Sequence, residues 1–155
     1  MGFEELMKEF AAKLGLAQLA QENDAVALEI DGIPFGFLHE PKTDMLIIAA
    51  DIGQQPESAD RPLGSMMLKA NFLYEALNGA VLFQNPDNEA FGIQERFRMV
   101  DLDADSLYAH VERLSNTAEE WREIVAGYGE AEAIAQKRQI EHQENPFAAS
   151  DFMRV

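Results

Sequence analysis

Side chains that could carry out chemistry are few in this sequence and lie far apart. The histidines, His39, His110 and His142, fall in different predicted elements, and none has a second metal ligand at helical spacing. No serine lies in a Gly-x-Ser-x-Gly elbow, and neither a P-loop nor a dinucleotide-binding fingerprint occurs. Paired carboxylates such as Asp101 and Asp103 are typical of a solvated surface in so acidic a chain. The sequence therefore predicts no catalytic residue, no metal site, no cofactor and no enzymatic activity.

The composition narrows the range of partners. The chain has 155 residues, with 12 Lys and Arg against 28 Asp and Glu, and a formal net charge of −16. Nucleic acids and anionic membranes both attract clustered cations, so neither is an expected partner. The sequence contains no cysteine, which excludes disulfides and thiolate metal sites. We also expect no signal peptide and no membrane span, because the longest apolar run covers only residues 45–50.

The pattern of apolar residues and turn signals predicts an α+β fold. The expected order is α-β-β-β-α-β-β-α, with a twisted antiparallel sheet and helices packed on it. The predicted elements are a helix over 3–14, a hairpin over 25–39, a strand over 45–52, a helix over 62–78, strands over 80–84 and 90–102, and a helix from Asp103 or Asp105 to the Gly127-Tyr128-Gly129 triplet.

The hairpin is centred on Asp31-Gly32, a strong signal for a two-residue turn. This turn predicts the cross-strand pairs Ile30 with Ile33, Leu28 with Phe35, and Val26 with Phe37. All six side chains then share one face of the ribbon. The pattern does not decide whether this face is the core or a binding groove.

The second helix is apolar on two sides. One stripe consists of Leu63, Met66, Met67, Ala70, Leu73 and Leu77, and the other of Leu68, Phe72 and Ala76. Such a helix needs two partners, and the sheet can cover only one stripe. We therefore expect a homodimer with Leu68, Phe72 and Ala76 at the interface.

The end of the chain is weakly patterned. We predict one domain over residues 1–129 and a separable C-terminal extension over 130–155, partly helical over 130–143 and mobile beyond Pro146. Its last apolar side chains are typical of a docking segment. They are Phe147, Phe152, Met153 and Val155.

This order of elements, with this size and acidity, resembles the class I type III secretion chaperones of the Tir chaperone (CesT-like) family. The resemblance covers about residues 3–127. The matching segments are Phe3-Glu4-Glu5-Leu6-Met7, Leu28-Glu29-Ile30-Asp31-Gly32, Leu46-Ile47-Ile48 and Leu68-Lys69-Ala70-Asn71-Phe72-Leu73.

The resemblance implies a cytoplasmic homodimer of bacteria that possess a type III secretion system. Such a chaperone binds an extended N-terminal segment of a secreted effector, keeps it soluble and export-competent, and delivers it to the secretion apparatus. The export ATPase is then a further candidate partner. Because aromatic anchors dominate many interfaces, we expect the first helix and the hairpin to contact the effector. The candidate contacts are Phe3, Phe10, Leu28, Phe35 and Phe37.

Two other functions fit the same residues. One is an α+β domain that binds a small ligand in a pocket between sheet and helix. The other is a chaperone-like anti-activator whose partner is a regulatory protein. A polypeptide or a small molecule that co-purifies with the chain separates these possibilities.

Overall fold

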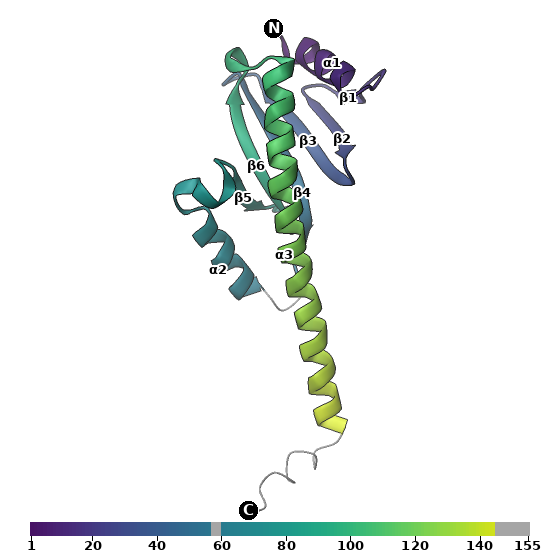
Figure 1. Ribbon diagram of the computed structural model, residues 1–155, viewed down its shortest axis with the longest axis vertical. Coiled ribbons are helices and arrows are strands. Elements are labelled where there is room, and N and C mark those ends of the chain that lie inside the picture. Colours follow the sequence, from purple (N-terminus) through teal and green to yellow (C-terminus); the bar gives the residue numbers. More distant parts are fainter. Residues whose placement is uncertain (57–59, 145–155) are drawn as a thin grey trace, which may run out of the picture.

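A computed structural model describes residues 1–56 and 60–144, and its described part contains a six-stranded antiparallel sheet with helices on one side (Figure 1). The strand order is β1-β2-β3-β4-β6-β5. The predicted α+β class and the order of the main elements are confirmed, and the short strand β1 is an addition. The elements are α1 (Phe3–Lys13), β1 (Gln21–Glu22), β2 (Ala25–Ile30), β3 (Ile33–Glu40), β4 (Met45–Gln54), α2 (Asp60–Ala70), the 3₁₀ helix η1 (Phe72–Leu77), β5 (Val81–Gln84), β6 (Ala90–Arg98), the 3₁₀ helix η2 (Met99–Asp101) and α3 (Ala104–Glu144).

The β2–β3 hairpin has the predicted register. Val26 lies opposite Phe37, and Ile30 lies opposite Ile33. Asp31 and Gly32 have φ angles of 52° and 77°, as expected for a two-residue turn that follows the twist of the strands. The Arg122 side chain of α3 donates a hydrogen bond to the Gly32 carbonyl oxygen at 3.0 Å. This contact ties the end of the hairpin to the long helix.

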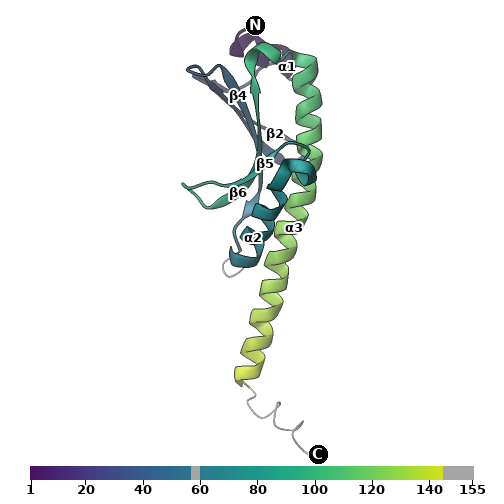
Figure 2. The same ribbon diagram turned by 90° about the vertical axis from the view of Figure 1, so that its left-hand side faces the viewer.

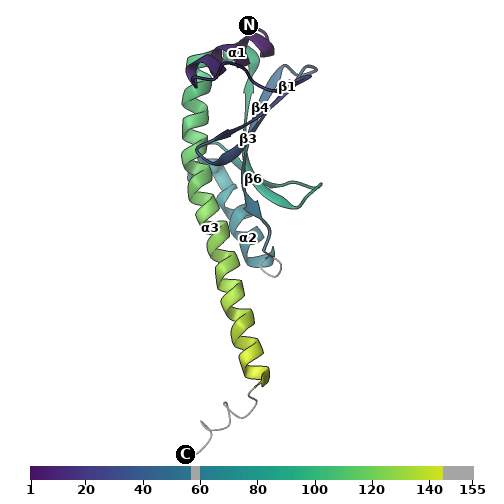
Figure 3. The same cartoon turned by 90° about the vertical axis from the view of Figure 1, so that its right-hand side faces the viewer.

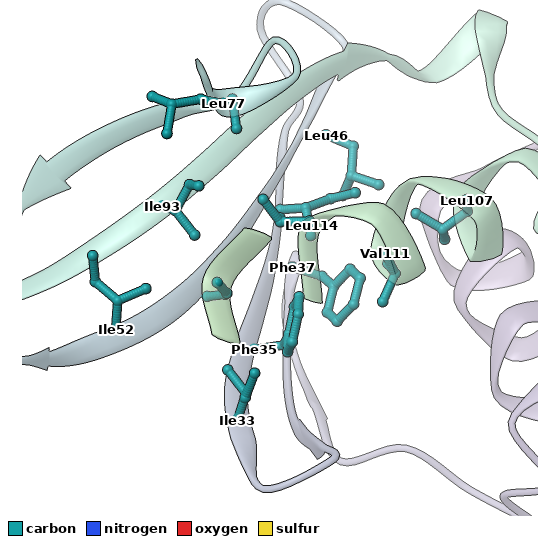
Figure 4. Close-up of a cluster of buried hydrophobic side chains, with 14 of the residues drawn as sticks. Ile33, Phe35, Phe37, Leu46, Ile52, Leu77, Ile93, Leu107, Val111 and Leu114 are labelled. Carbon is teal, nitrogen blue, oxygen red and sulfur yellow. The ribbon is translucent and has the colours of Figure 1, made fainter. Parts of the chain in front are cut away.

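The hydrophobic core lies between this face of the sheet and the helices α1 and α3. Figure 4 shows Phe35 and Phe37 beside Val111 and Leu114 of α3. The rings of Phe37 and Phe10 of α1 lie 5.4 Å apart between centroids. The sequence left two roles open for this face of the hairpin, and its burial shows that it is core.

The second helix is shorter than predicted. It ends at Ala70, and the chain continues after Asn71 as η1, so the single helix expected over 62–78 is wrong. Asn71 donates from Nδ2 to the Leu82 carbonyl oxygen at 3.1 Å, and its Oδ1 accepts the Leu82 N–H at 2.9 Å. An asparagine side chain that binds backbone competes with helix formation, which explains the interruption. The same two bonds occupy part of the outer edge of β5.

The third helix is longer than predicted. Asp103 caps its start, since Oδ1 accepts the Ser106 N–H at 2.7 Å. The predicted stop at Gly127-Tyr128-Gly129 is wrong, because α3 continues to Glu144. A glycine inside a helix costs only about 1 kcal/mol, and the residues that follow favour helix. The last turns project beyond the sheet (Figure 1). The proposed domain boundary at 129 thus falls within a helix, and the segment beyond Pro146 lies outside the described residues.

One carboxylate is buried on the core side of the sheet. Glu95 of β6 is 6% exposed, and Arg113 Nη2 lies 3.0 and 3.1 Å from its two carboxylate oxygens. Arg113 Nη2 also lies 3.0 Å from His110 Nδ1, and the His110 ring stacks on Phe97 at 4.0 Å. Burial first, and the Arg113 charge second, lower the pKa of His110, so this ring favours its neutral form. The neutral Nδ1 can then accept a hydrogen bond from the guanidinium.

Replacing Arg113 with alanine is expected to lower the free energy of unfolding by about 2–3 kcal/mol. The change leaves the Glu95 carboxylate buried without its cationic partner. Because the Arg113 side chain is itself 42% exposed, we expect a smaller loss of stability than for an ion pair whose two side chains are both buried. Urea denaturation followed by circular dichroism measures the change. Glu112→Ala, at an exposed position on the same helix, is the matched control. A loss no larger than in that control would contradict the structural role of the pair.

Candidate functional site

The five side chains predicted to contact a partner protein belong to the core rather than to a free surface. Four of them are at most 6% exposed, and Leu28 is half-buried against the same core. A side chain packed on all sides reaches a partner only if the core opens. Their burial indicates that the surface available to a partner lies elsewhere on the molecule. That these five side chains contact the effector stays a prediction, and their packing in the core argues against it. The four are Phe3, Phe10, Phe35 and Phe37.

The opposite face of the sheet, which we call the open face, has no helix over it among the described residues. Figures 2 and 3 show α3 on one side of the sheet and two hairpin ends projecting on the other. A hollow of about 550 Å³ lies on the open face, and a second of about 250 Å³ shares Gly36 and Ala49 with it. The first is lined mainly by apolar residues, including Ala25, Ala27, Leu38 and Ile47.

A row of small residues crosses the strands at the centre of this face. Cross-strand pairing aligns Ala27 of β2, Gly36 of β3 and Ala49 of β4, and the row ends at the larger, polar side chain of Gln94 of β6. We call this row of four residues the trough. Neighbouring strands lie about 4.8 Å apart, so the trough is about 15 Å long. A peptide that lies along it would meet a backbone with almost no side chains above it.

The two glycines on the open face differ in what covers them. A Cβ atom added to Gly36 would meet no atom within 4 Å, so the space above it is free. A Cβ atom added to Gly92 would lie 2.3 Å from Cζ of Phe83, so the Phe83 ring already rests on that backbone. The space over Gly36 is thus available to a second molecule, whereas the space over Gly92 is filled by the protein itself.

A second apolar surface lies on α2 and η1. Leu68 and Phe72 are 74% and 75% exposed, and Ala76 is also exposed. The other stripe of this segment contains buried side chains, with Leu63 and Leu77 each at most 1% exposed and Met67 at 6%. The segment is therefore apolar on two sides, as predicted, and only one side is covered by its own chain. Exposed side chains of this size are typical of a protein–protein interface.

The described part of the chain contains neither a metal-binding cluster nor a helix that could span a membrane. No group of three or more His, Asp or Glu side chains there is arranged to hold a metal ion. No helix there combines the length and the apolar character that crossing a membrane requires.

Comparison with known families assigns the chain. The model of the Tir chaperone protein (CesT) family matches residues 5–122, about three quarters of the sequence. The chain belongs to the Tir chaperone protein (CesT) family. The match includes the open face, α2 and most of the core, and it ends within α3. A search of curated protein sequences found no match.

Solved structures share the fold of this CesT-family protein at low sequence identity. The HopA1–SchA chaperone–effector complex contains a chain with a TM-score of 0.66 and 15% identity, covering 78% of this chain and 93% of that one. The ExsC–ExsE complex gives 0.64 and 18%, with 78% and 91% covered. The Yersinia pestis type III secretion chaperone SycH, in complex with a stable fragment of YscM2, gives 0.62 and 16%, with 77% and 99% covered. These likenesses confirm the fold.

The sequence pattern did not predict the trough of this CesT-family protein. Its central residues, Ala27, Gly36 and Ala49, are small and give no apolar signal. The available signal was indirect. One face of the hairpin carries three large apolar pairs while the other carries almost no large side chains, and a bare sheet face is suited to close approach of another backbone.

Proposed function

We propose that this CesT-family protein is a type III secretion chaperone that holds a segment of a secreted effector on its open face. The observation that carries the proposal is the apolar trough that its own helices leave uncovered. The HopA1–SchA structure, which has the same fold, is a chaperone–effector complex. A bound segment would place apolar side chains beside Leu38 and Ile47, where about 25 cal/mol is gained per Å² of apolar surface removed from water.

The same proposal explains how such a protein suppresses aggregation without chemistry. An effector segment that cannot bury its apolar side chains alone is prone to associate with other unfolded chains. The trough covers those side chains, and mass action then favours the bound form. The net charge of −16 adds repulsion between complexes.

The proposal extends to assembly and delivery. Two copies join through the exposed surface of α2 and η1, where Leu68 and Phe72 are otherwise in contact with water. The homodimer works in the bacterial cytoplasm, binds the effector near its N-terminus and passes it to the secretion apparatus, with the export ATPase as the receiving component.

Filling the trough tests the proposal. Gly36→Leu adds a side chain whose Cβ atom has no neighbour within 4 Å and which extends into the hollow, so we expect the fold to tolerate it. The added side chain occupies the space of client side chains worth about 1.5–3 kcal/mol, and affinity should fall about 10- to 100-fold. The measurement is calorimetric titration with the effector segment that co-purifies with the unaltered chain, identified by mass spectrometry.

Ala109→Leu is the matched control, because it adds the same side chain at an exposed position of α3 on the other side of the sheet. Both variants should keep the melting temperature of the unaltered chain. Full affinity in Gly36→Leu would exclude the trough as the binding site. A co-purifying regulatory protein would indicate the anti-activator instead, and a small molecule alone would indicate a ligand-binding domain.

A further inference from the structure

Phe83 of β5 shows which kind of side chain the open face places on a bare glycine. Phe83 and Gly92 of β6 are cross-strand partners. A Cβ atom added to Gly92 would lie 2.3, 2.6 and 3.0 Å from Cζ, Cε1 and Cε2 of the ring. The outer end of the ring therefore takes the place of the missing side chain. A cross-strand aromatic residue that covers a glycine supplies the contacts that the glycine lacks, and the protein closes the gap at Gly92 in this way.

Gly36 of β3 is a gap of the same kind that the described part of the chain leaves open. Its cross-strand partners are Ala27 and Ala49, and an added Cβ atom would have no neighbour within 4 Å. Gly36 does not have a positive φ angle, so its backbone conformation does not require a glycine. A glycine inside a strand weakens the strand and often marks a place where another molecule approaches closely.

The space over Gly36 can hold one aromatic side chain. The hollow of about 550 Å³ includes Gly36, and it is bounded on one side by Leu38 and Ile47, which pair across the strands. The hollow of about 250 Å³ includes both Gly36 and Phe83. An aromatic side chain buries about 150–250 Å² and fixes few torsion angles when it binds. A shorter aliphatic side chain would leave part of this space empty.

We infer that the effector segment bound on the open face is anchored by an aromatic side chain whose ring lies on Gly36, as the Phe83 ring lies on Gly92. This inference rests on the proposed function and adds the class of side chain that the trough selects. Gly36 is then a residue that determines specificity, because any side chain at this position occupies the space of the ring.

The test begins with a phage-displayed library of random peptides, selected separately on the unaltered chain and on Gly36→Leu. Peptides that only the unaltered chain retains depend on the trough, and we expect them to share an aromatic residue at one position. Selection on Ala109→Leu, the variant on the other side of the sheet, should yield the same peptides as the unaltered chain.

A double-mutant cycle then tests the contact itself. Gly36→Ala adds one methyl group where the ring is expected, and the free space around it should leave the melting temperature unchanged. The second change replaces the aromatic residue of a selected peptide with leucine. Gly36→Ala should lower the affinity for the aromatic peptide about tenfold and the affinity for the leucine peptide less than about threefold, as measured by calorimetric titration.

Nuclear Overhauser effects locate the ring directly. Labelling with carbon-13 glycine makes Gly36 and Gly92 observable among the ten glycines of the chain. Contacts between the Phe83 ring and the Hα protons of Gly92 should already be present in the free protein, where they give an internal reference. The corresponding contacts at Gly36 should appear only when the aromatic peptide is bound, and they should come from the peptide ring.

The outcomes separate this inference from the proposed function. Trough-dependent peptides without a shared aromatic residue, equal effects of Gly36→Ala on both peptides, or a bound ring without contacts to Gly36 would overturn the inference alone. If selection yields no peptide that distinguishes the unaltered chain from Gly36→Leu, the trough is not the client site, and the inference fails with it.

Discussion

Replacing Phe35 with serine is expected to lower the free energy of unfolding by about 3–5 kcal/mol, which is enough to unfold a domain of ordinary stability. Phe35 is 2% exposed, and its ring lies 6.3 Å from that of Phe37 between centroids. Serine leaves a cavity where the ring was and adds a buried hydroxyl that must find a hydrogen-bond partner. Urea unfolding followed by far-UV circular dichroism measures the loss.

Leu38→Ser is the control for this prediction. Leu38 lies on the same strand but on the open face, and it is 48% exposed. Its replacement should cost about 1 kcal/mol or less, because little packing is lost. A Phe35→Ser variant that melts like the unaltered chain but no longer binds its client would show that this face is a groove, contrary to its burial.

Features set by neighbouring residues could be predicted from the sequence. Asp31-Gly32 fixes the register of the β2–β3 hairpin, because a two-residue turn leaves one way to pair the strands. The strand over 45–52 is apolar on both faces, and it lies between β3 and β6 inside the sheet as that pattern predicts. Asp103 is a cap residue placed directly before an apolar helical stripe, and it starts α3.

The side of the sheet that is left uncovered could not be predicted in the same way. Alternation shows that Phe35 and Phe37 share a face, but it does not show which face a distant helix will cover. That choice depends on α3, which begins 67 residues after Phe37 and packs back on the sheet. The anchors expected to contact the effector were large aromatic residues, and α1 and α3 bury these side chains in the core.

The positions at which the helices end could not be predicted from local sequence either. The break after Ala70 comes from hydrogen bonds between Asn71 and Leu82 of β5, which are 11 positions apart in the sequence. Local propensity alone favoured a helix through that position. At Gly127 and Gly129 the two glycines predicted a stop, but the helix continues. The modest free-energy cost of two glycines is smaller than the preference of the flanking segments for helix.

Placing an aspartate at Phe72 is expected to separate the proposed homodimer into monomers. Phe72 is 75% exposed in the single chain, so the aspartate remains solvated there and the fold is preserved. In a dimer formed through α2 and η1, the same carboxylate would have to leave water without a cationic partner, which costs several kcal/mol. We therefore expect at least about a 100-fold weaker dimer, measured by analytical ultracentrifugation over a range of concentrations.

Val100→Asp is the matched control, because Val100 is 70% exposed and lies on η2 rather than on the proposed interface. Both variants should show the circular dichroism spectrum of the unaltered chain, since neither side chain belongs to the core. A dimer of unchanged affinity in Phe72→Asp would remove this helix from the interface. An unaltered chain that is itself monomeric at micromolar concentration would show that the exposed stripe of α2 has a different partner.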